Sequence, residues 1–242
     1  MTDYVLLSDQ PAGRNAWEDY IMRKNGKIQL LTGIGLLAAF AVFTLLLPVC
    51  NVRPVGQNGT EIGFAACNLR FHCWTGVHMT WYHMTDWLGL IPLLVCMGFG
   101  GLGLVQWVQR RKLWLVDRDI LLLGVYYIVV IACYLLFEEV AVNYRPILID
   151  GRMEASYPSS TTLLVLCVMP TLVFCGNRRW KRSVLRHSIK ILTRIFCAGM
   201  VLGRLFSGVH WLTDIIGAVL FSAGMFLSYR GTVLLCCQDA DK

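Results

Sequence analysis

The stretch GRLFSGVHWLTDIIGAVLF, residues 203–221, is apolar enough to lie in a lipid bilayer, yet it contains Arg204, His210 and Asp214. An unpaired charge near the bilayer centre costs at least about 2.5–3.5 kcal/mol. His210 and Asp214 are four residues apart, so a helix places them on one face. The stretch therefore predicts that these groups pair with one another, either in a functional site or in a structural ion pair between two membrane helices.

The composition of the whole chain favours the membrane. Of the 242 residues, 56% are hydrophobic and 15% are charged, whereas soluble domains contain about 25% charged residues. A membrane helix needs about 20 mainly apolar residues. We expect an all-α membrane protein, a bundle of six transmembrane helices with its active site at the extracytoplasmic face. The expected spans lie within residues 28–52, 87–109, 120–137, 155–177, 190–207 and 209–229.

Positive charge indicates the orientation of this bundle. With both termini in the cytoplasm, 17 of the 22 Lys and Arg residues lie inside and 5 lie outside, as cytoplasmic loops of membrane proteins prefer. We therefore expect a multi-pass protein of the cell membrane and no nucleic-acid partner. The expected parts are a cytoplasmic N-terminal segment at 1–27, a six-span domain at 28–230 and a cytoplasmic tail at 231–242.

Three polar clusters fall on the outer face in this topology. They are NYRP (143–146), YPSSTT (157–162) and the stretch 203–221. An arginine fork suits phosphate oxygens, which favours Arg145 and Arg204 as ligands, and a helix that starts at Ser159 or Ser160 offers free N–H groups to an anion. A carboxylate at Asp214 that accepts the Nδ1–H of His210 leaves Nε2 free as a nucleophile or base.

Each cluster also has a simpler explanation: a surface arginine, a helix cap and a structural ion pair. Together they favour phosphoryl chemistry. The same residues resemble the type 2 phosphatidic acid phosphatase family, membrane relatives of vanadium haloperoxidases, whose motifs are KxxxxxxRP, PSGH and SRxxxxxHxxxD. The third motif keeps Arg204, His210 and Asp214 at the family's spacing, with Gly203 in place of the leading Ser. The resemblance covers about residues 28–230.

The first two motifs are less complete. Arg145-Pro146 and Pro158-Ser159 are kept, but Glu138 stands in place of the family's Lys, Ser160 in place of its Gly, and Thr161 in place of its His. The resemblance implies that His210 attacks phosphorus to form a phosphohistidine and that Asp214 orients it. It also implies that Arg145, Arg204, Ser159 and Ser160 hold phosphate, with Thr161 as a substitute at the position of the general acid.

Threonine is no general acid at neutral pH. The proton for the leaving group then comes from another residue, with Glu138, Glu139, Glu154 and His83 as candidates, or the leaving group is a diphosphate that needs less protonation. The expected partner is a membrane lipid that bears phosphate or diphosphate, and the expected activity is its hydrolysis. The alternatives are head-group transfer, as in sphingomyelin synthase-like relatives, and lipid-phosphate binding without catalysis.

The remaining motifs carry weaker expectations. His72, His78 and His83 lie in the outer loop 51–85, but zinc needs three or four convergent ligands, so we expect no metal and no cofactor. Cys50, Cys67 and Cys73 lie in or beside the same loop, where a disulfide between two of them stays open. The glycines of GFGGLG, residues 98–103, are expected to permit close helix packing.

Overall fold

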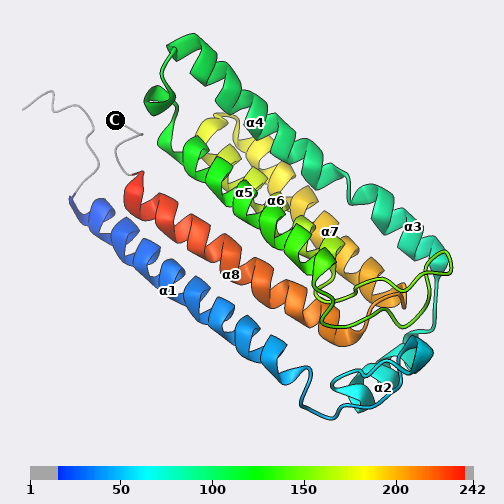
Figure 1. The fold of residues 1–242 in the computed structure, drawn as a ribbon. Helices are drawn as coiled ribbons and strands as arrows, with labels where there is room; N and C mark the ends of the chain where they lie inside the picture. Colours follow the sequence, from blue (N-terminus) through cyan, green and yellow to red (C-terminus); the bar gives the residue numbers. More distant parts are fainter. Residues whose placement is uncertain (1–15, 238–242) are drawn as a thin grey trace, which may run out of the picture.

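The computed structural model describes residues 16–237, and these form an antiparallel bundle of long helices (Figure 1). Within that range there are isolated β-bridges but no strands. The long helices are α1 (Ala16–Leu46), α4 (Ile91–Arg110), α5 (Arg118–Glu139), α6 (Ser160–Arg179), α7 (Ser183–Phe206) and α8 (Leu212–Cys236). Two 3-10 turns, η1 (Gln57–Gly59) and η2 (Leu113–Leu115), lie in the connections. The all-helical class predicted from the sequence is confirmed.

One end of the bundle carries the longer connections. Two short helices, α2 (Ala65–Thr75) and α3 (Met79–Leu88), lie there together with the loop of residues 140–159 (Figure 1). The beginning of α1 and the end of α8 lie at the opposite end (Figure 1). The three polar clusters of the sequence therefore share the loop-rich end, as their predicted topology requires.

Five helical segments of residues 16–237 are long and apolar enough to cross a membrane, which makes the chain a multi-pass membrane protein. They are Asp19–Leu46, Met79–Arg110, Arg118–Glu139, Ser160–Arg179 and Leu212–Cys236. The fifth predicted span, 190–207, lies in α7, which packs between α3, α6 and α8. Its first half contains Arg186, Lys190 and Arg194, and their charge lowers its hydropathy. The six-span count stays a prediction.

Exposed tryptophans mark both ends of the bundle. Trp74, Trp81 and Trp87 lie in or after α2 and α3 at the loop-rich end, and Trp107 and Trp114 lie around the end of α4. Tryptophan prefers the interface between lipid and water. Exposed tryptophans at both ends are expected if the bundle spans a bilayer. The loop-rich end would then lie at the level of the lipid headgroups.

The helices α1 and α8 make the most extensive contact of the bundle. Glycines allow the two backbones to approach closely. A Cβ added at Gly33 would lie 2.6 Å from the backbone nitrogen of Ser228, and one at Gly231 would lie 2.6 Å from that of Leu30. The expectation for GFGGLG is wrong for most of its glycines, because a Cβ at Gly98, Gly100 or Gly101 would meet nothing within 4 Å. Close packing occurs between α1 and α8 instead.

The ends of the helices differ from the expected spans. The first helix begins at Ala16, inside the segment assigned to the cytoplasm, and α8 continues to Cys236, inside the expected tail. Parts of both segments, residues 1–15 and 238–242, lie outside the described residues. Cys50, Cys67 and Cys73 are free thiols in the structure.

Replacement of Gly33 by Ala is expected to destabilise the bundle. The new Cβ would force α1 away from the backbone of α8, and overpacking of this kind costs about 1–3 kcal/mol. The control is Gly35→Ala on the same helix, where a Cβ meets nothing within 4 Å and where alanine gains about 1 kcal/mol of helix propensity. Thermal unfolding in detergent should therefore shift down for Gly33→Ala and not for Gly35→Ala. Equal shifts would contradict the close contact.

Candidate functional site

Three helix ends and one loop build the candidate site at the loop-rich end. The beginnings of α6 and α8 and the end of α7 meet there, and the loop 140–159 covers them (Figure 1). The backbone N–H of Ser159, before α6, donates to the carbonyl oxygen of Asp214 in α8 at 3.1 Å, and the N–H of Ser156 donates to the carbonyl oxygen of Asn143 at 2.9 Å. The first bond joins the second polar cluster to the third, and the second bond joins the residue before the second cluster to the first cluster.

His210 lies in the short turn between α7 and α8. Gly208 makes this turn, with φ of +70°, and a Cβ there would lie 1.9 Å from the carbonyl oxygen of Gly76. The imidazole is buried. Its Nδ1 lies 3.2 Å from the carbonyl oxygen of Ser156, and because a carbonyl only accepts, Nδ1 carries the proton. The lone pair is then on Nε2, which is buried and has no partner among the described residues.

Asp214 orients this histidine less directly than the sequence suggests. Its Oδ2 lies 3.6 Å from Nδ1 of His210, farther than the Ser156 carbonyl. The same oxygen accepts the backbone N–H of Trp211 at 2.8 Å, as the third residue of α8 does in a capping box. The carboxylate thus fixes the first turn of α8, while the Ser156 carbonyl determines which imidazole nitrogen is protonated.

The charge state of His210 follows from its surroundings. Burial lowers the pKa of this imidazole well below 6.5, and the positive charges of Arg145 and Arg204 lower it further. The hydrogen bond to Ser156 raises the pKa and does not offset them. His210 is therefore neutral at physiological pH, the form in which Nε2 is a nucleophile.

Arg145 and Arg204 both lie against the ring of Tyr82 in α3. The Cζ atoms of the two guanidinium groups are 5.7 Å and 5.0 Å from the centre of its ring. The Nε of Arg145 also lies 3.1 Å from Oε2 of Glu154, without hydrogen-bonding geometry. Both guanidinium groups contact the same ring, and both lower the pKa of the His210 imidazole. They therefore belong to a single cationic site.

Side chains of α3 and α6 hold Arg204, which lies in the last turn of α7. Its Nη2 lies 3.2 Å from Oδ1 of Asp86 and also donates to the hydroxyl of Thr161 in α6. The break between α3 and α4 at Gly89 allows this, since a Cβ at that position would lie 3.1 Å from Cγ2 of Thr161. Thr161, at the family's general-acid position, therefore contacts a phosphate-ligand candidate and lies at the site.

The site contains an unusual concentration of unsatisfied polar atoms. Eleven buried side-chain nitrogens and oxygens lack a hydrogen-bond partner among the described residues, and seven of them belong to this cluster. They are Nδ2 of Asn143, Nε and Nη1 of Arg145, Oγ of Ser156, Nε of Arg204, Nε2 of His210 and Oδ1 of Asp214. Buried polar atoms normally find partners, so the donors of this cluster are suited to an anionic ligand.

The serines at the start of α6 contribute unequally. Ser159 is fully buried, and its hydroxyl donates to the hydroxyl of Thr162 at 3.1 Å; it makes no capping bond to the helix backbone. Ser160 is the first helical residue and is half-buried. Both stand beside Thr161, so the structure places all seven predicted site residues at one end of the bundle.

Among the four predicted substitutes for the general acid, Glu154 is in an ion pair with Arg145 at the site. His83 packs on Tyr82, with ring centres 5.2 Å apart, while Glu138 and Glu139 are the last residues of α5. Sequence reasoning missed Tyr82 and Asp86, whose role depends on the contact between α3 and α7. It also gave no role to Asn143, the first residue of the NYRP cluster, or to Ser156, which directly precedes YPSSTT.

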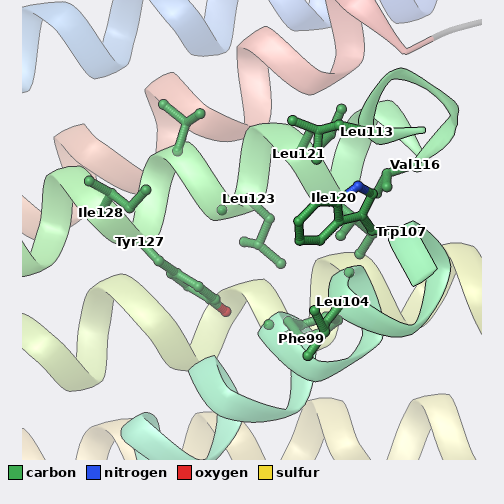
Figure 2. Close-up of a pocket in the computed structure, with 14 residues that line it drawn as sticks. Phe99, Leu104, Trp107, Leu113, Val116, Ile120, Leu121, Leu123, Tyr127 and Ile128 are labelled. Atoms are coloured by element: carbon green, nitrogen blue, oxygen red, sulfur yellow. The ribbon is translucent and has the colours of Figure 1, made fainter. Parts of the chain in front are cut away.

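A separate apolar pocket of about 380 Å³ lies between α4 and α5 (Figure 2). Phe99, Leu104, Ile120 and Leu123 point into it, and its titratable group, the Tyr127 hydroxyl, is hydrogen-bonded to Thr171 at 2.6 Å. The pocket has room for an acyl chain but no groups for catalysis. Residues 16–237 also contain no cluster of three or more His, Cys, Asp or Glu side chains that could hold a metal ion.

Comparisons with known proteins agree with this architecture. A model of the PAP2 superfamily matches residues 120–234. The fold is similar to that of the first transmembrane PAP2 type phosphatidylglycerolphosphate phosphatase from Bacillus subtilis, with a TM-score of 0.55 over 83% of this chain and 94% of that one. The two are 15% identical, so this likeness concerns the fold alone. No curated protein matches the sequence.

The matched segment contains Arg145, Arg204, His210 and Asp214, the residues on which the sequence resemblance depends. Residues 120–234 of the chain are thus similar to the PAP2 superfamily, the type 2 phosphatidic acid phosphatase family that the sequence motifs resemble.

Proposed function

We propose that the protein is an integral membrane phosphatase that hydrolyses a lipid phosphomonoester or diphosphate through a phosphohistidine on His210. The observation that carries this proposal is the free Nε2 of a neutral, buried imidazole beside two guanidinium groups that share one aromatic ring. A nucleophile next to donors suited to a phosphate is what phosphoryl transfer requires.

The reaction has two steps. Nε2 attacks phosphorus, the bond from phosphorus to the lipid oxygen breaks, and a carboxylic acid gives its proton to that oxygen. Water then attacks the phosphohistidine and gives a proton to the same carboxylate, the bond from phosphorus to nitrogen breaks, and phosphate leaves. Arg145 and Arg204 stabilise the charge on the phosphoryl oxygens in both steps.

The candidates for this carboxylic acid are the two residues that pair with the arginines of the site. Glu154 pairs with Arg145 and Asp86 pairs with Arg204, and their side chains are 40% and 58% exposed. Both therefore reach solvent and the site. Thr161 bonds to Arg204 and acts as a support for that arginine. A diphosphate substrate would depend least on the carboxylates because its leaving group is the better one.

An apolar pocket beside the site favours a lipid substrate. It has a volume of about 500 Å³ and lies between α3 and α7, where Trp81, Gly199, Leu202 and Phe206 line it. Gly203, which also lines it, directly precedes Arg204. The exposed tryptophans favour a position of this region at headgroup level, and the distribution of basic residues favours the outer leaflet. An acyl chain in this pocket would bring its phosphate to the arginines.

Head-group transfer differs from hydrolysis only in the acceptor. A lipid alcohol in place of water would attack the phosphohistidine, which would turn the same site into a phosphotransferase. Product analysis with and without an acceptor lipid separates the two activities. A protein that only binds lipid phosphates would show retention of the lipid without release of phosphate.

The first prediction concerns the nucleophile. The variant His210→Ala should release no phosphate above the blank from lipid phosphates in detergent, since no phosphohistidine can form. Brief incubation with substrate labelled in its phosphate should trap acid-labile label on the wild-type chain and not on this variant. An unchanged melting temperature shows that the variant is folded. Turnover at the wild-type rate would remove His210 from the mechanism.

The second prediction concerns pH. Because the pKa of His210 lies well below 6.5, protonation should reduce kcat/KM only at pH values well below 6.5. Arg145→Gln removes one of the charges that lower this pKa, so the acid limb of its profile should move to higher pH. Ionisation of the substrate is common to both enzymes and cancels in the ratio of their profiles. A ratio that does not change with pH would contradict the assignment.

The third prediction tests the lipid substrate. At Gly199 a new Cβ meets nothing within 4 Å, so Gly199→Phe should fill the pocket between α3 and α7 without distorting α7. KM for a long-chain lipid phosphate should rise about 10-fold or more, while KM for a short-chain soluble analogue stays constant. The control is Gly98→Phe on α4, also in open space. Equal effects on both substrates would contradict an acyl chain in this pocket.

A further inference from the structure

A second polar pocket lies on the far side of the molecule from the candidate active site. It has a volume of about 460 Å³ and lies between α6, α7 and α8. Its apolar part includes Pro170, Phe174 and Phe226, and its polar part includes the cations Lys190, Arg194 and Arg230. Along α8, Arg230 comes 16 residues after Asp214, about 24 Å at 1.5 Å per residue, so the two sites are separate.

Among residues 16–237, the three cations of this pocket have no counter-ion. None of them pairs with a carboxylate within residues 16–237. Other cations at the same end of the bundle do: Arg179 lies 2.8 Å from Asp119, and Arg110 lies 2.8 Å from Asp117. Within the described residues, Arg110 and Arg179 thus have carboxylate partners, whereas the three cations of the pocket have none and are available to another anion.

The position of these cations in the membrane makes the missing partner costly. Arg194 is 11 residues into α7 from Ser183, about 16 Å along the helix, and lies beside the apolar segments of α6 and α8 that are long enough to cross a membrane. Side chains of a helix point toward its N-terminus, which directs Lys190 and Arg194 toward the headgroups at the end where the chain begins. A charge at this depth is stable only with a partner or with access to the interface.

Arg230 provides a second, independent observation. Its Nε is buried and has no hydrogen-bond partner among the described residues. The Cζ of the same guanidinium lies 5.6 Å from the centre of the Phe174 ring, so the aromatic ring fixes the arginine inside the pocket. An immobilised guanidinium with an unsatisfied donor is suited to bind an anion.

We propose that this pocket binds an anionic phospholipid from the leaflet opposite the candidate active site. Its phosphate contacts Lys190, Arg194 and Arg230, and one acyl chain lies along the apolar part of the pocket. The charge of the cations selects the headgroup, and the apolar lining favours a lipid over a free phosphate ion. Because the three helices of the pocket also carry Thr161, Arg204 and Asp214, the lipid stabilises the helices on which the candidate site depends.

Lipid retention and thermal stability of the full chain in a neutral detergent test this proposal. Phosphatidylglycerol, a phosphodiester, should raise the melting temperature by about 3 °C or more and remain bound in native mass spectrometry, whereas phosphatidylcholine and soluble glycerol phosphate should do neither. The combined variant Lys190→Gln, Arg194→Gln, Arg230→Gln should lose both effects.

The matched control removes the same charge at the same end of the bundle. Lys112, Arg118 and Lys181 are exposed and lie outside the pocket, so their combined replacement by Gln should leave both effects intact. A second variant, Cys197→Phe, fills the pocket without a change of charge and should also lose them. Equal responses of the pocket and control variants would overturn the proposal, as would an equal response to glycerol phosphate.

The readout is independent of catalysis. The site variant Arg145→Gln should retain phosphatidylglycerol like the wild type, whether or not the protein is a phosphatase. Loss of the bound lipid in this variant would move the binding to the candidate active site and overturn the inference, while absence of phosphatase activity would leave it intact.

Discussion

The candidate site depends on one constraint, the burial of the Asp214 carboxylate in the first turn of α8. A buried carboxylate must accept hydrogen bonds, and this one accepts the Trp211 N–H. The carbonyl of the same residue accepts the Ser159 N–H. The start of α8 is thereby joined to the start of α6, and the loop that precedes α6 presents the Ser156 carbonyl to His210. The orientation of the imidazole follows from these backbone contacts.

The carboxylates at the loop-rich end of the bundle offset the positive charge of Arg145 and Arg204 only in part. Each arginine has one carboxylate partner, Glu154 or Asp86, and both carboxylates are partly exposed. An exposed partner is screened by water, whereas the guanidinium groups are buried. The buried space around Nε2 of His210 therefore stays electropositive, which keeps the imidazole neutral and attracts an anion.

The sequence predicts those parts of the site that depend on local spacing or on the direction of the chain. Helical periodicity brings His210 beside Asp214, and alternation of the spans brings Arg145 to the same end. Other parts depend on contacts without a local signal. Tyr82 and Asp86 reach the arginines because α3 packs on α7, and the Ser156 acceptor is a backbone atom. The glycines of α4 look like a packing motif, yet most of them face open space. The orientation in the membrane and the number of spans rest on charge and hydropathy alone.

The close contact between α1 and α8 has a consequence for biosynthesis. Of the described helices α1 leaves the ribosome first, and its most extensive contact is with α8, which leaves last. The glycines of α1 therefore have no partner in α8 until α8 has been synthesised. Contacts between such distant segments form late in folding. The insertion machinery or lipid has to shield α1 in the meantime, and a chain interrupted before α8 would lack both this partner and the nucleophile candidate.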